Sequence, residues 1–404
     1  MVYTQSEHGI NRADVDADAI RIVERLVAGG FETYIVGGAV RDLLLRKKPK
    51  DFDIVSAASP NQIKKIFRFA RIIGHRFRLV HVAVGEKIFE VATFRSIAEG
   101  ATGNIFGTIE EDVLRRDFTL NALFYDPGKQ LVIDYVGGMK DIRNRRIKPI
   151  IPLKTMFIDD PVRIIRAVKY ASVSGFRLPL SLGLKIRRQA HLLDEVSPSR
   201  RTEEIFKIIR SSSAVVIVEN LENFGLYQYL QPNASKLMQE DSAFRQKYLQ
   251  RIAALNQENK QSEDKKNLAA LIWDYLEMVV DWNEQHIDHY KKTFYEARHF
   301  VLPMNPPRFD LDAAVKLIYR EHGVIVKHLL FANDRLRDRQ HEPMSPSNQK
   351  EARYVSAKSD TPALPAQEKS PLQDGQIGEQ ELKKRKRRHH KKSQHFTNVG
   401  IVDL

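Results

Sequence analysis

Cysteine is absent from this 404-residue chain, which excludes disulfide bonds and metal sites built from thiolates. Disulfides are frequent in oxidising compartments, so a chain without cysteine is expected in the cytoplasm. The sequence also has no run of eighteen or more apolar residues, and its first twenty residues have neither the basic start nor the apolar core of a signal peptide. We therefore expect a cytoplasmic protein that has no membrane partner.

Two other patterns are also missing. No segment repeats at a fixed period, so a repeat architecture is not expected. No His-Asp dipeptide occurs, so a metal phosphohydrolase domain with that signature is not expected either. The chain is 42% apolar, which is enough to bury substantial cores, and its length indicates two or three domains.

Positive charge is the first feature that is abundant. The formal net charge is +14, which indicates a polyanionic partner. The segment 383–392, which begins with Lys383 and ends with Lys392, holds eight Lys or Arg residues. It belongs to a stretch, residues 341–404, that is rich in Pro, Ser, Gln and Lys and nearly lacks aromatic residues. We predict that residues 341–404 form a disordered basic tail, because they cannot bury enough apolar surface to order themselves.

The pattern of apolar residues divides the rest of the chain. Short β-rich runs such as "TYIV" (33–36) and "KIFEVATF" (87–94) alternate with helical segments in the first 145 residues, which predicts a mixed sheet covered by helices. Residues 190–340 have helical spacing with few strand signals. The predicted fold class is therefore α+β, with a catalytic head at 1–145, a helical neck at 146–210, a helical body at 211–340 and the tail at 341–404.

A Gly-Gly turn and an aspartate pair form the first candidate site. Gly37 and Gly38 follow the predicted strand "TYIV", and the free N–H groups at the start of the predicted helix "AVRDLLL" (39–45) can bind phosphate. In "DFDIV" (51–55), Asp51 and Asp53 point to one face of a predicted strand. Two carboxylates there can hold two Mg²⁺ ions about 4 Å apart, which activate a hydroxyl and neutralise a leaving pyrophosphate. Each pattern alone is also consistent with a solvent-facing strand and an ordinary turn.

The combination is more specific. "GGAVRDLLL" followed by "DFDI" resembles the head of the class II tRNA nucleotidyltransferase and poly(A) polymerase family, which has a nucleotidyltransferase fold like that of DNA polymerase β. Four further segments resemble motifs of this family and follow in its order. These segments are "RRDFTLNALFYD" (115–126), "DYVGGMKDI" (134–142), which is similar to the hinge between head and neck, "DDPVRIIRAVKYASVSGF" (159–176) and "SPSRRTEEIFKII" (197–209).

The resemblance assigns roles to residues of the head. It implies that Gly37, Gly38 and Arg41 seat the triphosphate of ATP, that Arg116 contacts the incoming nucleotide, and that Asp117 belongs with the active-site carboxylates. Asp117 has another interpretation, as the N-cap of a helix formed by "FTLNALFY" (118–125). Glu90 is a rival third carboxylate, because it lies on the face of its predicted strand opposite Phe89 and Val91. The sequence does not decide between Glu90 and Asp117.

The third segment resembles the family's nucleotide-reading helix. Adenine and cytosine both present an amine donor beside a ring-nitrogen acceptor, so the carboxylate of Asp160 and the guanidinium of Arg163 suit A and C and mismatch G and U. Arg166 and Lys169 lie further along the same face and can meet phosphates. The alternative is a helix that begins at an Asp160 N-cap and has a solvated basic face. In the fourth segment, Arg200 and Glu204 are expected to be structural supports.

Members of this family add either CCA to tRNA or poly(A) to RNA. "IIGHRFRLVHV" (72–82) resembles the basic signature of bacterial poly(A) polymerases, although His75 replaces a basic residue and the following link "SIAEGATG" (96–103) is short. The basic tail also fits this branch, since it can hold any RNA by its phosphates. We predict a template-independent poly(A) polymerase that adds AMP from ATP to RNA 3′ ends with two Mg²⁺ ions and releases pyrophosphate. The alternatives are CCA addition and, in another class, a silent RNA-binding protein. The sequence identifies no protein partner.

Overall fold

The computed structural model describes residues 1–74, 79–96, 106–255, 263–282, 287–324 and 326. Three features of the sequence lie outside these residues: the basic tail, most of the link after Arg95, and the centre of the "IIGHRFRLVHV" signature, including His75. All the described residues belong to one compact unit.

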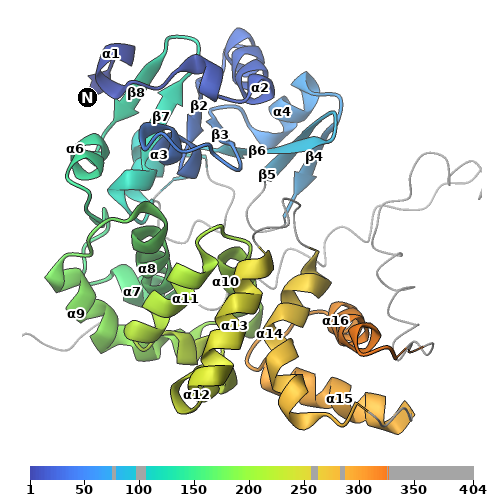
Figure 1. Ribbon diagram of the computed structural model, residues 1–404. Coiled ribbons are helices and arrows are strands. Elements are labelled where there is room, and N and C mark those ends of the chain that lie inside the picture. Colours follow the sequence, from blue (N-terminus) through green and yellow to red (C-terminus); the bar gives the residue numbers. More distant parts are fainter. Residues whose placement is uncertain (75–78, 97–105, 256–262, 283–286, 325, 327–404) are drawn as a thin grey trace, which may run out of the picture. The chain divides into compact units, whose positions relative to one another are not determined.

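A mixed sheet of eight strands dominates the first part of this unit (Figure 1). Its strand order is β1-β8-β7-β2-β3-β6-β5-β4, in which β3 and β6 run parallel and all other neighbours run antiparallel. The predicted mixed sheet is therefore confirmed. The strands are β1 (Val2–Tyr3), β2 (Thr33–Val36), β3 (Asp53–Ser56), β4 (Ala70–Ile73), β5 (Leu79–Val84), β6 (Lys87–Thr93), β7 (Leu123–Asp126) and β8 (Leu131–Asp134).

Helices cover both faces of the sheet. Alternate residues of β2 and β3 enter two different clusters: Ile35 and Ile54 join a core with α2, α3 and α4, whereas Val36 and Val55 join a smaller cluster with α5. This alternation is the consequence of the two-residue period of a strand. The helical elements of this part are α1 (Gln5–His8), η1 (Arg12–Asp14), α2 (Ala17–Ala28), α3 (Gly38–Leu44), α4 (Pro60–Ile66), α5 (Ile109–Leu114), η2 (Thr119–Asn121) and α6 (Gly138–Arg143).

Two local predictions need correction. The strand predicted at "DFDIV" begins only at Asp53, so Asp51 lies in the preceding loop and does not share a strand face with it. The helix considered for "FTLNALFY" does not form. Its first half is the short 3₁₀ turn η2 and its second half is strand β7, which pairs with β2 and β8. Asp117 is consequently not a helix N-cap.

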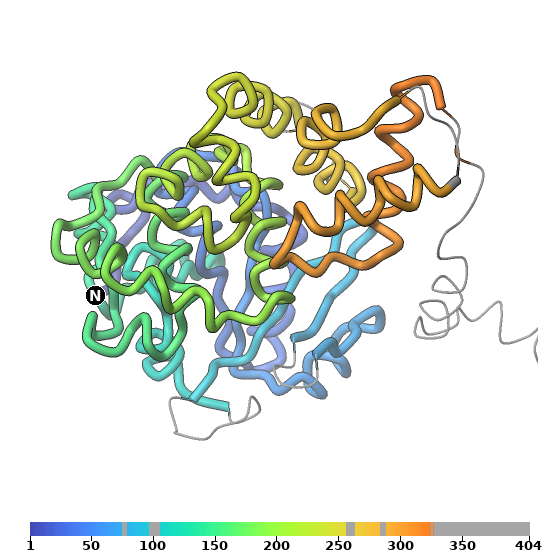
Figure 2. Tube along the Cα trace, turned by 90° about the horizontal axis from the view of Figure 1, so that it is seen from below, coloured from blue at the N-terminus to red at the C-terminus, as the bar shows by residue number. Residues whose placement is uncertain are grey.

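Helices make up the regular structure of the described residues that follow Asp134. The later helices α14, α15 and α16 pack against one another (Figure 2). No helix in the described part of the chain is long and apolar enough to cross a membrane. The elements are α7 (Met156–Asp159), α8 (Val162–Ser174), α9 (Leu180–Gln189), η3 (Ala190–Glu195), α10 (Pro198–Ile209), α11 (Ala214–Asn223), η4 (Tyr227–Tyr229), α12 (Pro232–Glu240), α13 (Ser242–Leu255), α14 (Asp264–Val279), α15 (Ile287–Phe300) and α16 (Arg308–Glu321).

The glycine pair of "DYVGGMKDI" lies in a tight, capped turn at the start of α6. The buried carboxylate of Asp134 accepts hydrogen bonds from four successive backbone N–H groups, those of residues 136–139, at 2.8–3.0 Å. Gly137 has a φ of 83°, which favours glycine. A Cβ atom on Gly138 would lie 2.4 Å from the carbonyl oxygen of Thr119, so close packing requires the second glycine.

Candidate active site

The turn after β2 brings Gly37 against Asp53. Val36 pairs directly with Asp53 across the sheet, so the turn that follows Val36 lies beside the first residue of β3. Gly37 has a φ of 71°, in the left-handed region. A Cβ atom on Gly37 would lie 3.6 Å from Asp53 Oδ2 and 3.9 Å from Arg116 Nη1. An acidic and a basic side chain therefore both lie close to this turn.

Asp53 is the most perturbed carboxylate at this edge of the sheet. Its side chain keeps contact with solvent, but surrounding protein excludes much of the water, and this burial raises its pKa to about 6. The negative charges of Glu90 and Asp51 raise the pKa further, while Arg116 lowers it. Glu90 is exposed on β6, and its neighbour Val91 pairs with Ile54 of the parallel strand β3. The structure thus places Asp51, Asp53 and Glu90 near one another.

The predicted nucleotide contacts Arg116 and Arg41 are both held by protein groups. Arg116 donates to Asp112 at 2.8 and 3.1 Å and to the carbonyl oxygen of Asn121 at 3.0 Å. Arg41 is buried and donates to the side chains of Asp42 and Asn121, each at 2.9 Å. Asn121 therefore braces both arginines, a role that the sequence analysis missed, although the residue stands inside the recognised segment 115–126.

The acidic group fits a divalent cation by its donor chemistry, because Mg²⁺ prefers carboxylate oxygens. The pKa of Asp53 is raised first by burial and then by repulsion from Glu90 and Asp51, and a bound cation would offset both effects. Within the described ranges, no three His, Asp or Glu side chains are gathered closely enough to form a complete protein-ligated metal site. This is compatible with Mg²⁺, which keeps several waters and binds through one or two carboxylates plus substrate phosphates.

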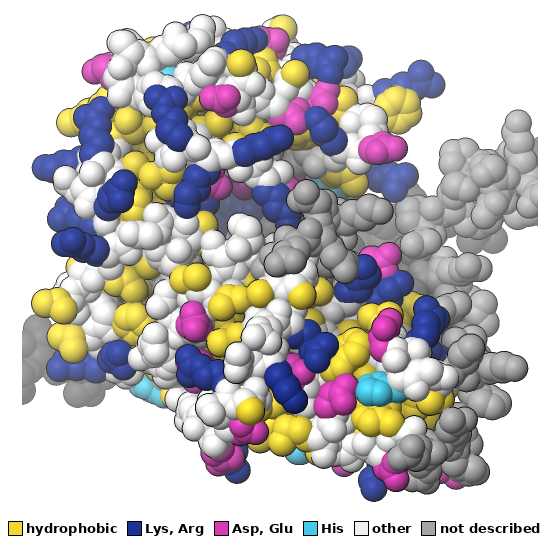
Figure 3. All heavy atoms as spheres, viewed as in Figure 1, with side chains coloured by type: hydrophobic (Ala, Val, Ile, Leu, Met, Phe, Trp, Pro, Cys, Tyr) yellow, Lys and Arg dark blue, Asp and Glu magenta, His cyan; other side chains and the backbone are white. Residues whose placement is uncertain are grey.

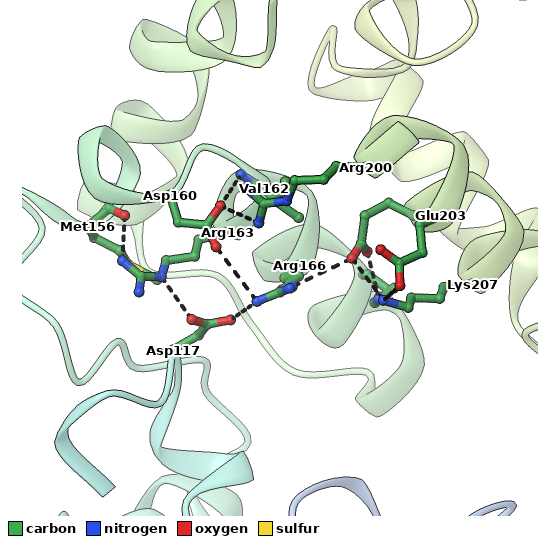
Figure 4. A network of polar contacts seen from close by, with 11 residues as sticks. Asp117, Met156, Asp160, Val162, Arg163, Arg166, Arg200, Glu203 and Lys207 are labelled. Carbon is green, nitrogen blue, oxygen red and sulfur yellow. Dashed lines mark hydrogen bonds and ion pairs between the residues drawn. The ribbon is translucent and has the colours of Figure 1, made fainter. Parts of the chain in front are cut away.

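Asp117 has different partners from the aspartate pair. Arg163 Nε donates to Asp117 Oδ1 at 2.8 Å, and Arg166 Nη1 donates to Asp117 Oδ2 at 2.9 Å (Figure 4). Both arginines come from α8, and 46 and 49 residues separate them from Asp117 along the chain. Burial opposes the charge of Arg166, but Asp117 and its other neighbours outweigh that effect and raise its pKa. Both oxygens of Asp117 are thus engaged by guanidinium groups.

Asp160 lies just before α8. Its Oδ1 accepts from the backbone N–H of Val162 at 3.3 Å and from Arg200 Nη2 at 2.9 Å, and its Oδ2 lies 4.0 Å from Arg166 Nη1. The contact with Val162 is of the kind expected of a cap, but α8 begins one residue later than predicted, with Pro161 at its N-cap position. Arg200, which the sequence predicted to be a structural support, is the side chain that binds Asp160, a partner that the sequence did not indicate. No ion pair joins Asp160 to Arg163 in the described structure; each is held by another residue.

Lys169 is directed to a buried carboxylate. Its Nζ donates to Glu204 Oε2 at 3.1 Å, and Lys207 lies 3.6 Å from the other oxygen of Glu204. Burial alone would raise the pKa of Glu204, but Lys169, Lys207 and Arg166 together hold it below its usual value. Glu204 of α10 therefore binds Lys169 of α8 and joins the two helices.

Comparison with known proteins places the chain among nucleotidyltransferases. Residues 33–148 match a family model described as the poly A polymerase head domain, and residues 175–238 match one described as the probable RNA and SrmB-binding site of polymerase A. Poly(A) polymerase I of Salmonella typhi is 40% identical over 256 residues, which are 59% of this chain and 55% of that protein. The aligned part thus spans little more than half the length of that relative.

Two further relatives show both branches of the family. Poly(A) polymerase I of Haemophilus influenzae is 35% identical over 303 residues, which cover 69% of this chain and 67% of that protein. The CC-adding tRNA nucleotidyltransferase of Halalkalibacterium halodurans is 33% identical over 246 residues, 60% of each chain.

The fold has a counterpart among solved structures. The CCA-adding enzyme of Bacillus stearothermophilus in complex with CTP superimposes with a TM-score of 0.51 at 24% identity, covering 83% of this chain and 90% of that one. The mixed sheet with its helical continuation is thus a nucleotidyltransferase fold. The chain belongs to the class II tRNA nucleotidyltransferase and poly(A) polymerase family.

Proposed function

We propose that the chain is a template-independent poly(A) polymerase that adds AMP from ATP to RNA 3′ ends and releases pyrophosphate. The observation that carries the proposal is Asp53, which lies at the Gly37 turn beside Asp51, Glu90 and Arg116. The two poly(A) polymerases I are also more similar in sequence than the CC-adding relative, at 35–40% against 33% identity.

The carboxylates are proposed to hold two Mg²⁺ ions. Asp51 and Asp53 are the ligands in this proposal, and we favour Glu90 over Asp117 as the third carboxylate, because Glu90 acts on the pKa of Asp53 whereas both oxygens of Asp117 are bound by arginines. When bound, Mg²⁺ would lower the pKa of the attacking RNA hydroxyl and neutralise the leaving pyrophosphate.

The chain's own residues supply binding and orientation. Gly37 and Gly38 let the triphosphate approach the backbone of the turn, and Arg116 and Arg41 place positive charge beside it. Asp160 accepts from the exocyclic amine of adenine and Arg163 donates to its ring nitrogen. Arg166 and Lys169, which are held by Asp117 and Glu204, add positive charge that attracts the phosphates. Catalysis in this scheme consists mainly of positioning and charge neutralisation.

RNA is the proposed partner. Lys and Arg side chains are spread over the face shown in Figure 3, on both the part with the sheet and the helical part. We propose that residues 1–145 form the catalytic head, 146–210 the neck that reads the base, 211–340 an RNA-binding body and 341–404 a basic RNA-binding tail. A cytoplasmic location, indicated by the absence of cysteine, belongs to the same proposal.

Substitution of the central carboxylate tests the enzymatic proposal. Asp53→Asn removes the charge but keeps the shape, so it should abolish most incorporation of labelled AMP into RNA, by a factor that corresponds to several kcal/mol of barrier, on the order of 10³-fold. Asp126→Asn, at the far end of β7, is the matched control and should remain active. Near wild-type incorporation by Asp53→Asn would contradict the site, and silence of the wild type would favour the RNA-binding alternative.

CCA addition to tRNA is the second candidate. The similarity to the CC-adding tRNA nucleotidyltransferase favours it, and the pair Asp160 and Arg163 accepts cytosine as well as adenine. The metal and triphosphate assignments are the same in both reactions, so only the nucleotide used and the RNA extended distinguish them.

A further inference from the structure

The proposed base-reading arginine is fixed on two sides before any nucleotide binds. Arg163 Nε donates to Asp117 Oδ1 at 2.8 Å, and its Nη1 donates to the carbonyl oxygen of Met156 at 3.0 Å. The Arg163 side chain is only 15% exposed. A guanidinium that is held by two acceptors loses most of its rotational freedom, so its remaining N–H groups have a defined direction (Figure 4).

The proposed base-reading carboxylate is fixed in the same way. Arg200 Nη2 and the Val162 N–H both bind Oδ1 of Asp160, at 2.9 and 3.3 Å. Among the described residues, its second oxygen, Oδ2, has only the longer 4.0 Å approach of Arg166 Nη1. One oxygen therefore positions the carboxylate, and the other keeps the capacity to accept from a base.

These contacts also keep the two proposed base-reading groups, Asp160 and Arg163, apart. Asp160 and Arg163 stand on either side of Pro161 and Val162, and opposite charges at this spacing would attract each other if their other partners were removed. A direct ion pair between them would use up the donor and the acceptor that a base needs. Asp117 and Arg200 prevent this ion pair, because Asp117 gives Arg163 another partner of opposite charge and Arg200 does the same for Asp160.

We propose that Asp117 and Arg200 are positioning residues that determine base selectivity by holding Arg163 and Asp160 as separate, pre-oriented donor and acceptor groups. This inference rests on the proposed function, since it assumes that these two groups face the base. It gives Asp117 a role at the base end of the site in place of the metal end. The adjacent residues Arg116 and Asp117 then serve opposite ends of the site, because Arg116 lies beside Asp53 while Asp117 binds Arg163, the proposed base-reading arginine.

Nucleotide selectivity of two variants tests the inference. Asp117→Asn keeps the size of the side chain but turns an N–H₂ donor toward one of the two guanidinium groups. Arg200→Met keeps an unbranched, flexible side chain, though a shorter one, and removes its donors. In each variant the ratio of kcat/KM for ATP to that for GTP, measured by extension of an RNA primer, should fall about tenfold or more, as expected when one charged hydrogen bond is lost. Equilibrium binding of ATP and GTP without RNA should show the same loss of discrimination.

Two controls separate positioning from a general effect of charge or stability. Glu203→Gln removes a carboxylate from the same network, but the described contacts of Glu203 are with Lys207, so its ATP to GTP ratio should equal that of the wild type. Arg200→Lys keeps a positive donor near Asp160 and should restore part of the selectivity that Arg200→Met loses. If Asp117→Asn does not fold, the half-exposed position 200 decides the test, because a substitution there leaves the core unchanged.

The outcomes distinguish the inference from the proposed function. If the wild type prefers ATP and the foldable variants keep its ATP to GTP ratio, the positioning roles are wrong while the polymerase proposal stands. If the wild type transfers no nucleotide or does not discriminate between ATP and GTP, the proposed function itself fails, and the inference fails with it. If the ATP to GTP ratio falls in the Asp117 and Arg200 variants but not in Glu203→Gln, the result supports both the proposed function and the positioning roles.

Discussion

The proposed role of Asp53 requires an ionised carboxylate, but its surroundings oppose ionisation. It must be ionised to bind a cation, yet burial and the charges of Glu90 and Asp51 raise its pKa to about 6, above the value of 3.8 for a free carboxyl. The folded protein without metal therefore binds a proton at this position more tightly than the unfolded chain does. The consequence is a carboxylate that weakens the metal-free fold at neutral pH and becomes favourable when a cation arrives.

The stability of the metal-free protein should report this conflict. Because the folded pKa of Asp53 is raised, its contribution favours folding below about pH 4 and is lost as the pH rises through about 6. Asp53→Asn should consequently have a higher unfolding temperature than the wild type at pH 8 in a chelator, with the difference disappearing near pH 4. Thermal unfolding followed by circular dichroism measures it.

Addition of Mg²⁺ at pH 8 provides the internal control for that experiment. A ligand that binds only the folded state raises the unfolding temperature, so the wild type should gain stability while Asp53→Asn gains little. Equal unfolding temperatures of the two metal-free proteins at pH 8 would show that Asp53 is not repelled by its neighbours.

At the scale of elements, local patterns predicted those structures whose causes are local. The segment "SPNQ" (59–62) has the Ser, Pro and Gln that are typical of a capping box, and Ser59 and Gln62 form that box at the start of α4. The strand at 33–36 and the outward position of Glu90 on β6 are confirmed, since a strand's period of two fixes which side chains share a face.

Local patterns gave wrong predictions where contacts between distant parts of the sequence determine the secondary structure. Residues 118–125 could be a helix or a strand by their apolar content, and the pairing of Phe124 with Val36 and Ile133 selects the strand. Asp51 was expected on β3, but the ladder between β2 and β3 ends at Val36 and Asp53, where the chain turns away on both sides. The contacts of Asp117 with α8 join residues 46 or more positions apart, which no local pattern reveals.

The start of α6 offers a test of element packing. Gly138→Ala adds a methyl group 2.4 Å from the Thr119 carbonyl oxygen and 3.1 Å from Leu123, where backbone must move to make room. The free energy of unfolding should fall by about 1–3 kcal/mol, as for other overpacked sites. Gly128→Ala is the matched control, since its added Cβ atom would lie 3.4 Å from its nearest neighbour, Asp126 Oδ1. Denaturant titration measures both changes, and equal losses would contradict the packing account.

At the scale of the whole molecule, positive charge is concentrated in the segment 383–392, which lies outside the described residues. We predict that deletion of residues 341–404 leaves turnover on saturating RNA unchanged but weakens RNA affinity. The log–log dependence of affinity on salt should flatten by about 0.7 for each phosphate of single-stranded RNA that the tail no longer neutralises. Filter binding at several salt concentrations measures the slope, and an unchanged slope would show that the tail does not bind RNA.

Whether this chain makes poly(A) is decided by the nucleotide that it adds to a simple primer. The purified protein is incubated with Mg²⁺, an unstructured RNA primer and each nucleoside triphosphate in turn, with a tRNA lacking its terminal CCA as the parallel substrate. Our account predicts a long homopolymer with ATP, weak use of CTP and no use of GTP or UTP, since G and U mismatch the donor and acceptor of Arg163 and Asp160. Failure to extend the primer, together with addition of two C and one A to the tRNA followed by a stop, would contradict it and establish CCA addition instead.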